Sequence, residues 1–225
     1  MNVSERIKTI VDEISHRTLA DIGTDHGYIP IYAYKTAKID SAIACDVNEI
    51  PLLNAKSNIF SYEINKYIQT RLGYGLIPIQ AGESETCTIA GMGGDLIINI
   101  LDCSKELVQN FSQLILQPQS KIENVRRYIH DIGFRIVNEE FIEEAGKYYT
   151  VINSIKGEKE KYTPTEYVLG KILIEKKVPI FIEYINKEKN KIEAVIKKIE
   201  KEENTGIEEK IAYLNSYIEI YKEVL

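Results

Sequence analysis

The chain has 225 residues, a formal net charge of −6 and 28% charged residues, a size and composition that suit one α/β domain with an appendage. No run of 18 apolar residues occurs and no apolar segment follows a basic N-terminus, so neither a membrane span nor a signal peptide is expected. The three cysteines lack CxxC spacing and the three histidines do not cluster with them, which argues against disulfides and a metal site and favours a reducing, cytoplasmic setting.

Two helices flank the first predicted strand. Apolar residues recur at helical spacing over residues 4–15, and Ser4 is placed to cap that helix. The strand, residues 19–22, is a short apolar run that includes Asp21. A glycine turn follows it, and a second helical pattern covers residues 28–37. A glycine turn between a first strand and a first helix is where doubly wound α/β sheets bind nucleotide-like ligands.

The glycine turn carries acidic groups where a dinucleotide site would need glycine. The dinucleotide fingerprint is G-x-G-x-x-G, but Asp25 stands at its second glycine and Asp21 precedes the turn. Two carboxylates beside a diphosphate would repel it by roughly 4 kcal/mol per close pair at an effective dielectric of 20. The ligand is therefore expected to be cationic here, as are the sulfonium and α-amino group of S-adenosylmethionine. The structural alternative is that Gly23 and Gly27 form a tight turn and Asp25 caps the helix.

The second predicted strand, residues 41–46, also ends in an acid. Asp46 can accept hydrogen bonds from both hydroxyls of a ribose, the role that dinucleotide folds give to an acid at this place. It can alternatively cap the helix predicted over residues 50–64. A third strand covers residues 67–72 and is closed by Gly73.

The fourth predicted strand, residues 86–90, runs directly into a glycine-rich segment, residues 91–94. A helix over residues 96–101 follows. The segment could be a flexible turn, or a place where backbone approaches a ligand too closely for side chains to fit. Its place at the carboxyl end of a strand favours the ligand.

The remaining strands complete a seven-stranded sheet. A fifth strand over residues 113–116 and a helix over residues 122–132 precede two final strands, residues 134–140 and 148–152. Their short connection, residues 144–147, predicts an antiparallel hairpin at the sheet edge. The alternating order predicts a mostly parallel sheet with helices on both faces. A terminal hairpin on such a sheet is typical of Rossmann-like methyltransferases, and this domain is expected over residues 1–157.

Residues 158–225 are expected to form a second, α-helical domain. From Val178 to Ile199 apolar residues follow a 4-3 repeat broken only by Lys189, and from Ile207 to Leu225 the repeat is unbroken. A turn at residues 204–206 separates the two stretches, after a helix that begins near Thr165. This pattern predicts an antiparallel coiled-coil hairpin, and a dimerisation element fits it equally well.

Several motifs together resemble one family, the bacterial tRNA (adenine-N1)-methyltransferases that modify the adenine at position 22 of tRNA. They are ADIGTDHGYIPIYA at 20–33, TIAGMGGDLI at 88–97, LILQPQ at 114–119 and the C-terminal hairpin. The resemblance covers the whole chain and implies a class I methyltransferase domain, S-adenosylmethionine as cofactor and tRNA as substrate. Two departures are Gln119, where the family usually has asparagine, and Asp46, where a glutamate is familiar.

The resemblance also implies which residues form the site. The residues expected to bind the cofactor are Asp21, Gly23, Thr24, Asp25, His26, Ile29, Asp46, Val47, Asn48, Gly73, Tyr74, Ala90, Gly91 and Met92. Those expected to bind the substrate are Arg6, Gly93, Gly94, Gln117, Pro118, Arg126 and Arg127, and the catalytic pair is Asp25 and Gln119. No metal is expected to be required.

The partner expected from these motifs is tRNA, bound by a monomer or by a weak dimer formed through the hairpin. Residues 187–201, where six Lys outnumber three Glu, are expected to contact the RNA or to be a solvated helix face. The rival functions are a methyltransferase with another acceptor, an NAD-dependent oxidoreductase on the same fold, and a non-catalytic RNA-binding or dimerisation module.

Overall fold

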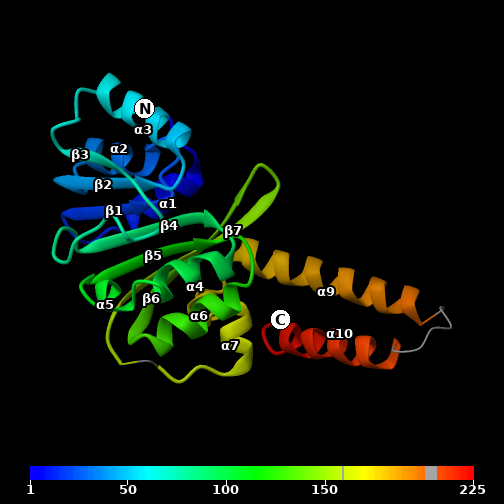
Figure 1. Ribbon diagram of the computed structural model, residues 1–225. Helices are drawn as coiled ribbons and strands as arrows, with labels where there is room; N and C mark the ends of the chain where they lie inside the picture. The colour runs from blue at the N-terminus through cyan, green and yellow to red at the C-terminus, as the bar shows by residue number, and fades with distance from the viewer. Residues whose placement is uncertain (159, 201–206) are drawn as a thin grey trace. The chain divides into compact units, whose positions relative to one another are not determined.

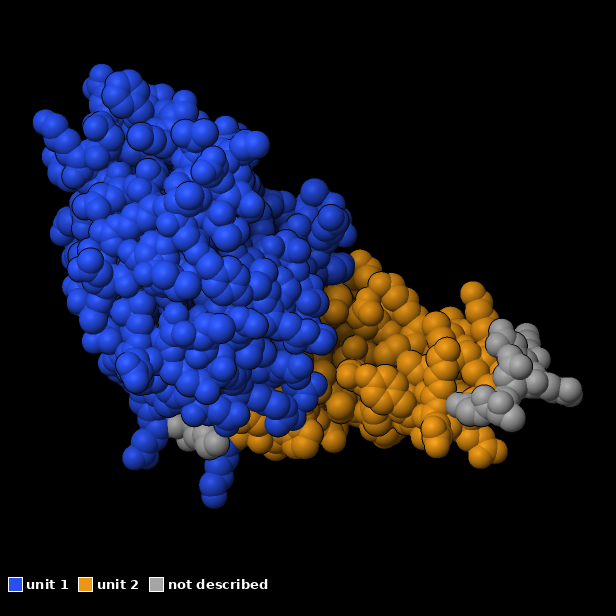
Figure 2. Space-filling view, viewed as in Figure 1, with its two compact units in different colours: residues 1–161 blue, residues 162–225 orange. Residues whose placement is uncertain are grey.

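The computed structural model describes residues 1–158, 160–200 and 207–225. The chain divides into two compact units, residues 1–161 and 162–225, coloured separately in Figure 2. The predicted domain boundary between residues 157 and 158 lies near this division. Among the described helices, none combines the length and the apolar character needed to cross a membrane.

A seven-stranded sheet forms the centre of the first unit, in the order β3-β2-β1-β4-β5-β7-β6. The strands β1 to β5 pair in parallel, whereas β7 is antiparallel to both β5 and β6. The predicted fold class, including the antiparallel end of the sheet, is therefore confirmed. The strand bounds are β1 (Thr18–Ile22), β2 (Ser41–Asp46), β3 (Ile68–Leu72), β4 (Thr86–Met92), β5 (Gln113–Pro118), β6 (Phe134–Glu144) and β7 (Lys147–Lys156).

A tight turn joins the last two strands. Ala145 and Gly146 connect the paired residues Glu144 and Lys147, and both have positive φ, 51° and 74°. Two consecutive residues of this kind make the primed turn whose twist matches an antiparallel hairpin. The hairpin was predicted at this place, and both of its strands are longer than predicted.

Helices cover both faces of the sheet (Figure 1). One apolar cluster joins residues of α1, α2 and α3 to β1, β2 and β3, which puts these three helices on one face. The helices α4 and α6 contact one another on the other face, and the short helix α5 was not predicted. Their bounds are α1 (Glu5–Asp12), α2 (Tyr28–Lys35), α3 (Glu49–Ser61), α4 (Gly94–Asp102), α5 (Lys105–Val108) and α6 (Ile122–Asp131).

A buried polar network fastens the C-terminal end of α1 to the sheet. The side chain of Gln113 on β5 donates to the Glu13 carbonyl at 2.7 Å and to the Asn153 side chain at 2.9 Å. Asn153 and Asn138 each donate to one carboxylate oxygen of Glu13, both at 2.7 Å. These bonds fix the C-terminal end of α1 beside the start of β5. The N-terminal turn of α1 lies near the carboxyl end of the same strand, where Arg6 contacts Gln117.

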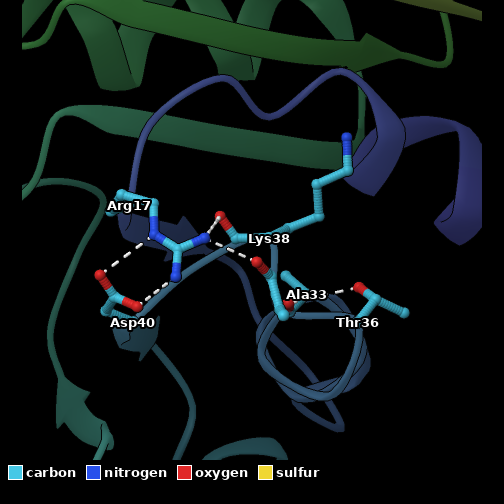
Figure 3. Close-up of polar contacts among 6 residues, drawn as sticks. Arg17, Ala33, Thr36, Lys38 and Asp40 are labelled. Carbon is cyan, nitrogen blue, oxygen red and sulfur yellow. Dashed lines mark hydrogen bonds and ion pairs between the residues drawn. The ribbon is translucent and has the colours of Figure 1, made fainter.

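At the amino ends of β1 and β2, Arg17 ties two loops together (Figure 3). Its Nε donates to the Asp40 carboxylate at 3.1 Å, and its Nη1 donates to the carbonyls of Ala37 at 2.6 Å and Lys38 at 3.3 Å. The guanidinium lowers the pKa of the Asp40 carboxyl group. This cluster lies at the edge of the sheet that is remote from the carboxyl ends of the parallel strands.

The second unit consists of α7 (Pro164–Leu169), α8 (Lys171–Lys176), α9 (Pro179–Ile199) and α10 (Ile207–Lys222). The predicted helix from Thr165 is broken at Gly170 and Lys177, whose φ values are 93° and 48°. The helices α9 and α10 lie side by side (Figure 1). Buried residues of the predicted repeats are Ile185, Ile196, Ile199, Ile218 and Tyr221. The predicted turn at residues 204–206 lies outside the described residues.

Candidate active site

A cavity of about 480 Å³ opens at the carboxyl ends of the parallel strands. The ends of β1, β2, β4 and β5, the loop after β3, and α1 supply its walls, as expected for a ligand site in an α/β sheet. The lining residues are Arg6, Ile7, Ile10, Ile22, Gly23, Thr24, Asp25, His26, Tyr28, Ile29, Asp46, Val47, Asn48, Gly73, Tyr74, Gly75, Ala90, Gly91, Met92, Leu96, Ile100 and Gln119.

The turn after β1 is held in a conformation that only some residues adopt easily. Gly23, Asp25 and Gly27 all have positive φ, at 72°, 51° and 73°. The amides of Gly23 and Thr24 both donate to the carbonyl of Cys45 on β2, at 2.9 Å each. A side chain at Gly23 would also collide with Met92, whose terminal carbon lies 2.1 Å from the position of a Cβ. The turn therefore favours glycine at position 23 for its backbone conformation, whereas the flexible end of Met92 could move aside to make space.

Asp21 lies beneath this turn, outside the cavity wall. It is 1% exposed, and its two carboxylate oxygens accept hydrogen bonds from the hydroxyls of Thr24 and Thr88, at 2.6 Å each. The pKa of Asp21 is raised to about 6, mainly by burial and to a smaller extent by the nearby Asp46, against the opposing effect of the two hydroxyl hydrogen bonds. Asp21 therefore holds Thr24 from behind the cavity wall, and its direct contact with a cofactor stays a prediction.

Asp46, the last residue of β2, lines the cavity and links the end of β2 to the turn after β1. It is 7% exposed, and its carboxylate accepts from the backbone amides of Asp25 at 3.2 Å and Asn48 at 2.9 Å. Each carboxylate oxygen can accept a second hydrogen bond. The remaining capacity faces the cavity, where ligand hydroxyls would reach it.

Asp25 and His26 stand at the mouth of the cavity. The side chain of Asp25 is 65% exposed, and its carboxylate lies 3.6 Å from Nε2 of His26. The His26 ring stacks on Tyr28, with ring centroids 5.3 Å apart. The rim therefore combines one negative charge with a pair of exposed aromatic rings.

The glycine-rich segment after β4 forms the floor between the strand ends. Gly91 has a φ of 78°, and its amide donates to the side chain of Gln117 at 3.0 Å. Gly94 begins α4, where a Cβ would lie 2.5 Å from the carbonyl of Ser120. Gly91 is thus needed for backbone conformation at the cavity and Gly94 for close packing behind it.

The loop after β3 closes the other side of the cavity. Tyr74 lines it, and its hydroxyl donates to Asn99 of α4 at 3.1 Å. Leu96 and Ile100, four residues apart on α4, add apolar surface to the same wall. This wall suits the flat, largely apolar face of a nucleobase.

The first turn of α1 brings a cation to the cavity. Nη1 of Arg6 donates to the Gln117 side chain at 3.1 Å, and the guanidinium carbon lies 5.3 Å from the centre of the Tyr149 ring. Gln119 follows β5 on the same side of the cavity. Its backbone N–H donates to the Met92 carbonyl at 2.9 Å, which fixes its position.

The structure brings most of the predicted site together. Of the residues predicted to bind the cofactor, all but Asp21 line the cavity, and so do the predicted catalytic residues Asp25 and Gln119. Of those predicted to bind the substrate, only Arg6 lines it. In the described structure Gly93, Gly94, Gln117, Pro118, Arg126 and Arg127 lie outside its wall.

Neither of the two arginines predicted to bind the substrate from α6 lines the cavity. The side chain of Arg126 is 2% exposed and forms an ion pair with Glu139 at 2.7 Å. A buried guanidinium needs such a paired carboxylate, so this location does not fit the predicted contact with a substrate. Arg127 is exposed, but it pairs with Glu123 on the same helix and stands away from the cavity wall.

Sequence reasoning missed several apolar members of the wall: Ile7, Ile10, Ile22, Leu96 and Ile100. The spacing of Ile7 and Ile10 indicated a buried helix face, and the same face also borders the cavity. Spacing alone could not separate core from cavity, because both bury an apolar stripe. No cluster of histidine, cysteine or acidic residues suited to a metal ion occurs in the described part of the chain.

Comparison with known proteins identifies the family. The sequence matches the family described as tRNA (adenine(22)-N(1))-methyltransferase over residues 19–223. The chain belongs to this family. The methyltransferase is 30% identical to the tRNA (adenine(22)-N(1))-methyltransferase of Bacillus subtilis (strain 168), over 232 residues that span 100% of this chain and 98% of that protein.

Two solved structures place the methyltransferase among proteins seen with nucleoside ligands. Streptococcus pneumoniae Sp1610 in complex with S-adenosyl-L-methionine is 33% identical, with a TM-score of 0.90 and coverage of 100% of both chains. M. capricolum TrmK in complex with S-adenosyl-homocysteine is 27% identical, with a TM-score of 0.85 and coverage of 98% of this chain and 96% of that one. The predicted enzyme class, methyl donor and tRNA substrate are those of this family, and these predictions are confirmed.

Proposed function

We propose that the cavity binds S-adenosylmethionine and presents it to N1 of adenine 22 of a tRNA. One observation carries this proposal: the carboxylates of Asp25 and Asp46 stand in the wall of a single cavity at the strand ends. A pyrophosphate cofactor would be repelled there, whereas a sulfonium and an ammonium group would be attracted. The volume of about 480 Å³ and the glycine-lined floor suit a nucleoside with an amino-acid tail.

Different residues of the cavity would bind different parts of the cofactor. The turn at Gly23–His26 would hold the methionine end, because its backbone approaches closely and Asp25 supplies negative charge. The free acceptor capacity of Asp46 suits the ribose hydroxyls, with Val47 and Asn48 beside it. The wall at Gly73 and Tyr74 suits the adenine ring.

The bound cofactor supplies a methyl group already activated by its sulfonium. N1 of adenine has a free lone pair at neutral pH, so the protein has no proton to remove before the attack. The residues at the mouth therefore act by alignment, which supplies roughly 7–11 kcal/mol when reacting atoms are held about 3–3.5 Å apart. Methylation leaves a cationic adenine, and the carboxylate of Asp25 and the side-chain carbonyl of Gln119, which both line the cavity, would stabilise that charge.

The target adenine must leave its stack to enter the cavity, which costs a few kcal/mol. The exposed rings of His26 and Tyr28 at the rim offer a surface for the displaced base or its neighbour. We further propose that the lysines of α9 contact tRNA, that the enzyme acts in the cytoplasm without a metal, and that it is a monomer or a weak dimer through the α9–α10 hairpin.

Transfer of a labelled methyl group to unmodified tRNA, followed by identification of the nucleoside by mass, tests the function. We expect 1-methyladenosine in wild-type transcript and none in a transcript with guanine at position 22. Label at another position, or in a protein or small molecule, would favour a methyltransferase with another acceptor. Binding of NAD without binding of S-adenosylmethionine would favour the oxidoreductase, and tRNA binding without transfer would favour a non-catalytic module.

Asp25→Asn tests the proposed charge at the mouth. Because this change removes the negative charge near the sulfonium and the methylated base, we expect turnover to fall about 100-fold in single-turnover assays. Asp40→Asn is a matched control, since Asp40 is 66% exposed and lies at the opposite edge of the sheet. Wild-type turnover and cofactor affinity in Asp25→Asn would remove Asp25 from the mechanism.

A further inference from the structure

Arg6 is a cavity cation with unused hydrogen-bonding capacity. Its Nη1 donates to Gln117 and its guanidinium lies over Tyr149, but its Nε is buried and has no partner among the described residues. A buried N–H without an acceptor costs about 1–3 kcal/mol. That buried N–H is out of a ligand's reach, but the Nη N–H groups not used by Gln117 also have no acceptor among the described residues, and these are the donors that a ligand in the cavity would reach.

The position of Arg6 is set by Gln117, a residue that lies behind the cavity wall. Gln117 is fully buried, and a single oxygen of its side chain accepts from both Nη1 of Arg6 and the amide of Gly91. The guanidinium therefore stands beside Gly91, with Nη1 3.4 Å from the point where a Cβ would lie. Gln117 thus couples α1, β5 and the glycine-rich segment at one atom.

Charge balance indicates what Arg6 would bind. None of the ion pairs found among the described residues joins Arg6 to an acid, so its charge is left for a ligand. The methylated adenine is cationic, and a guanidinium held against N1 would oppose the reaction. The partner of Arg6 is therefore an anionic oxygen elsewhere on one of the two ligands.

We propose that Arg6 is the oxyanion-binding residue of the cavity and that Gln117 is its positioning residue. This inference rests on the proposed function. The oxyanion is either the α-carboxylate of the cofactor or a phosphate of the nucleotide to be methylated, and both offer the paired oxygens that a guanidinium binds. Arg6 would thereby complement the acids across the cavity, which attract the cationic groups of the same ligands.

The first experiment measures ligand affinity by calorimetry with the full-length protein. The probes are S-adenosylmethionine and decarboxylated S-adenosylmethionine, which lacks the α-carboxylate. The variants are Arg6→Met and Arg6→Lys, with Arg17→Met as a control of equal charge change at the far edge of the sheet. If Arg6 binds the carboxylate, wild type prefers S-adenosylmethionine by about 10- to 100-fold, and Arg6→Met loses that preference.

The second experiment measures tRNA binding over a range of salt concentrations. If Arg6 binds a phosphate, Arg6→Met lowers the slope of log affinity against log salt by about one, and Arg17→Met leaves it unchanged. Unchanged preference between the two nucleosides together with an unchanged salt slope would overturn the inference. If the wild-type protein does not bind S-adenosylmethionine or does not methylate tRNA, the proposed function is overturned instead.

Variants of Gln117 separate positioning from packing. Gln117→Asn keeps a neutral amide oxygen as an acceptor, one methylene shorter, and we expect it to retain more of the wild-type preference or slope than a variant without an acceptor. Gln117→Leu removes the acceptor, and we expect it to behave as Arg6→Met does. If both Gln117 variants fold, as judged by thermal unfolding, and both retain wild-type binding, Gln117 does not position Arg6.

Discussion

Asp21 is a carboxyl group that the protein buries completely and yet keeps beside another acid. Its pKa of about 6 lies above the ordinary value of 3.8 because burial disfavours the charged form. The native state therefore binds this proton more tightly than the unfolded state does. Between about pH 4 and pH 6 the contribution of Asp21 to the free energy of unfolding falls as pH rises, and it stays low above pH 6.

Asp21→Asn should remove this pH dependence. Relative to wild type, we expect the variant to gain stability as pH rises from 3.5 to 7.5, by on the order of 3 kcal/mol. Urea unfolding at a series of pH values measures the change, and the difference between the two proteins cancels the contribution of other groups. A difference that does not vary with pH would show that Asp21 is not the titrating group. The lost acceptor for Thr24 or Thr88 lowers the variant's stability equally at all pH values.

At the scale of elements, the loop that closes the cavity after β3 is held by one ion pair. The two terminal nitrogens of the Arg71 guanidinium donate to the Glu83 carboxylate, at 2.6 and 2.8 Å, and Nη1 also donates to the Pro78 carbonyl at 2.8 Å. Arg71, together with the amide of Gln80, lowers the pKa of Glu83 to about 2. The stabilisation is therefore complete above about pH 4.5 and is lost as pH falls toward 2.

Glu83→Gln should loosen this loop. At pH 7 we expect the free energy of unfolding to fall by about 1–3 kcal/mol, because a charged, bidentate contact is replaced by a neutral one. We also expect weaker binding of S-adenosylmethionine, since the loop carries Gly73 and Tyr74. Chemical unfolding and calorimetry measure the two effects, and Glu85→Gln is the control because Glu85 makes no contact with Arg71. Equal stability of Glu83→Gln and wild type would contradict the role of the pair.

The sequence was most informative about elements whose signal is local. Strands β1, β2 and β4 were predictable because each is an apolar run that ends in an acid or glycine, and the β6–β7 turn because its residues are close in sequence. The buried ion pair of Arg126 could not be predicted, because its partner, Glu139, lies on another element and no local pattern reports that pairing. Gln117 was predicted to touch the substrate, whereas long-range contacts with Arg6 and Gly91 place it behind the cavity.

At the scale of the whole molecule, charge is unevenly distributed along the chain. Residues 161–225 contain 12 Lys and 12 Glu, so the net charge of −6 arises entirely in residues 1–160. The acidic first unit would repel RNA except near Arg6 and other local cations. The described lysines of α9, among them the exposed Lys197 and Lys198, therefore remain the predicted contact with tRNA.

Paired substitutions on the two long helices test this prediction. We expect Lys197→Gln with Lys198→Gln to raise KM for tRNA several-fold and to reduce the salt slope of tRNA binding, by about one per lost phosphate contact. Cofactor affinity should not change. Lys210→Gln with Lys222→Gln removes the same charge from α10 and is the matched control. Equal effects of the two pairs would indicate general attraction and not a contact made by α9.

The place of β7 between β5 and β6 has a consequence for synthesis on the ribosome. β6 is made first, yet its hydrogen bonds within the sheet go to β7. A nascent chain that ends before residue 147 therefore exposes the bare edge of β5, and β6 has no strand to join. Because β6 joins the sheet only through β7, the sheet is not complete until residue 156 has left the exit tunnel.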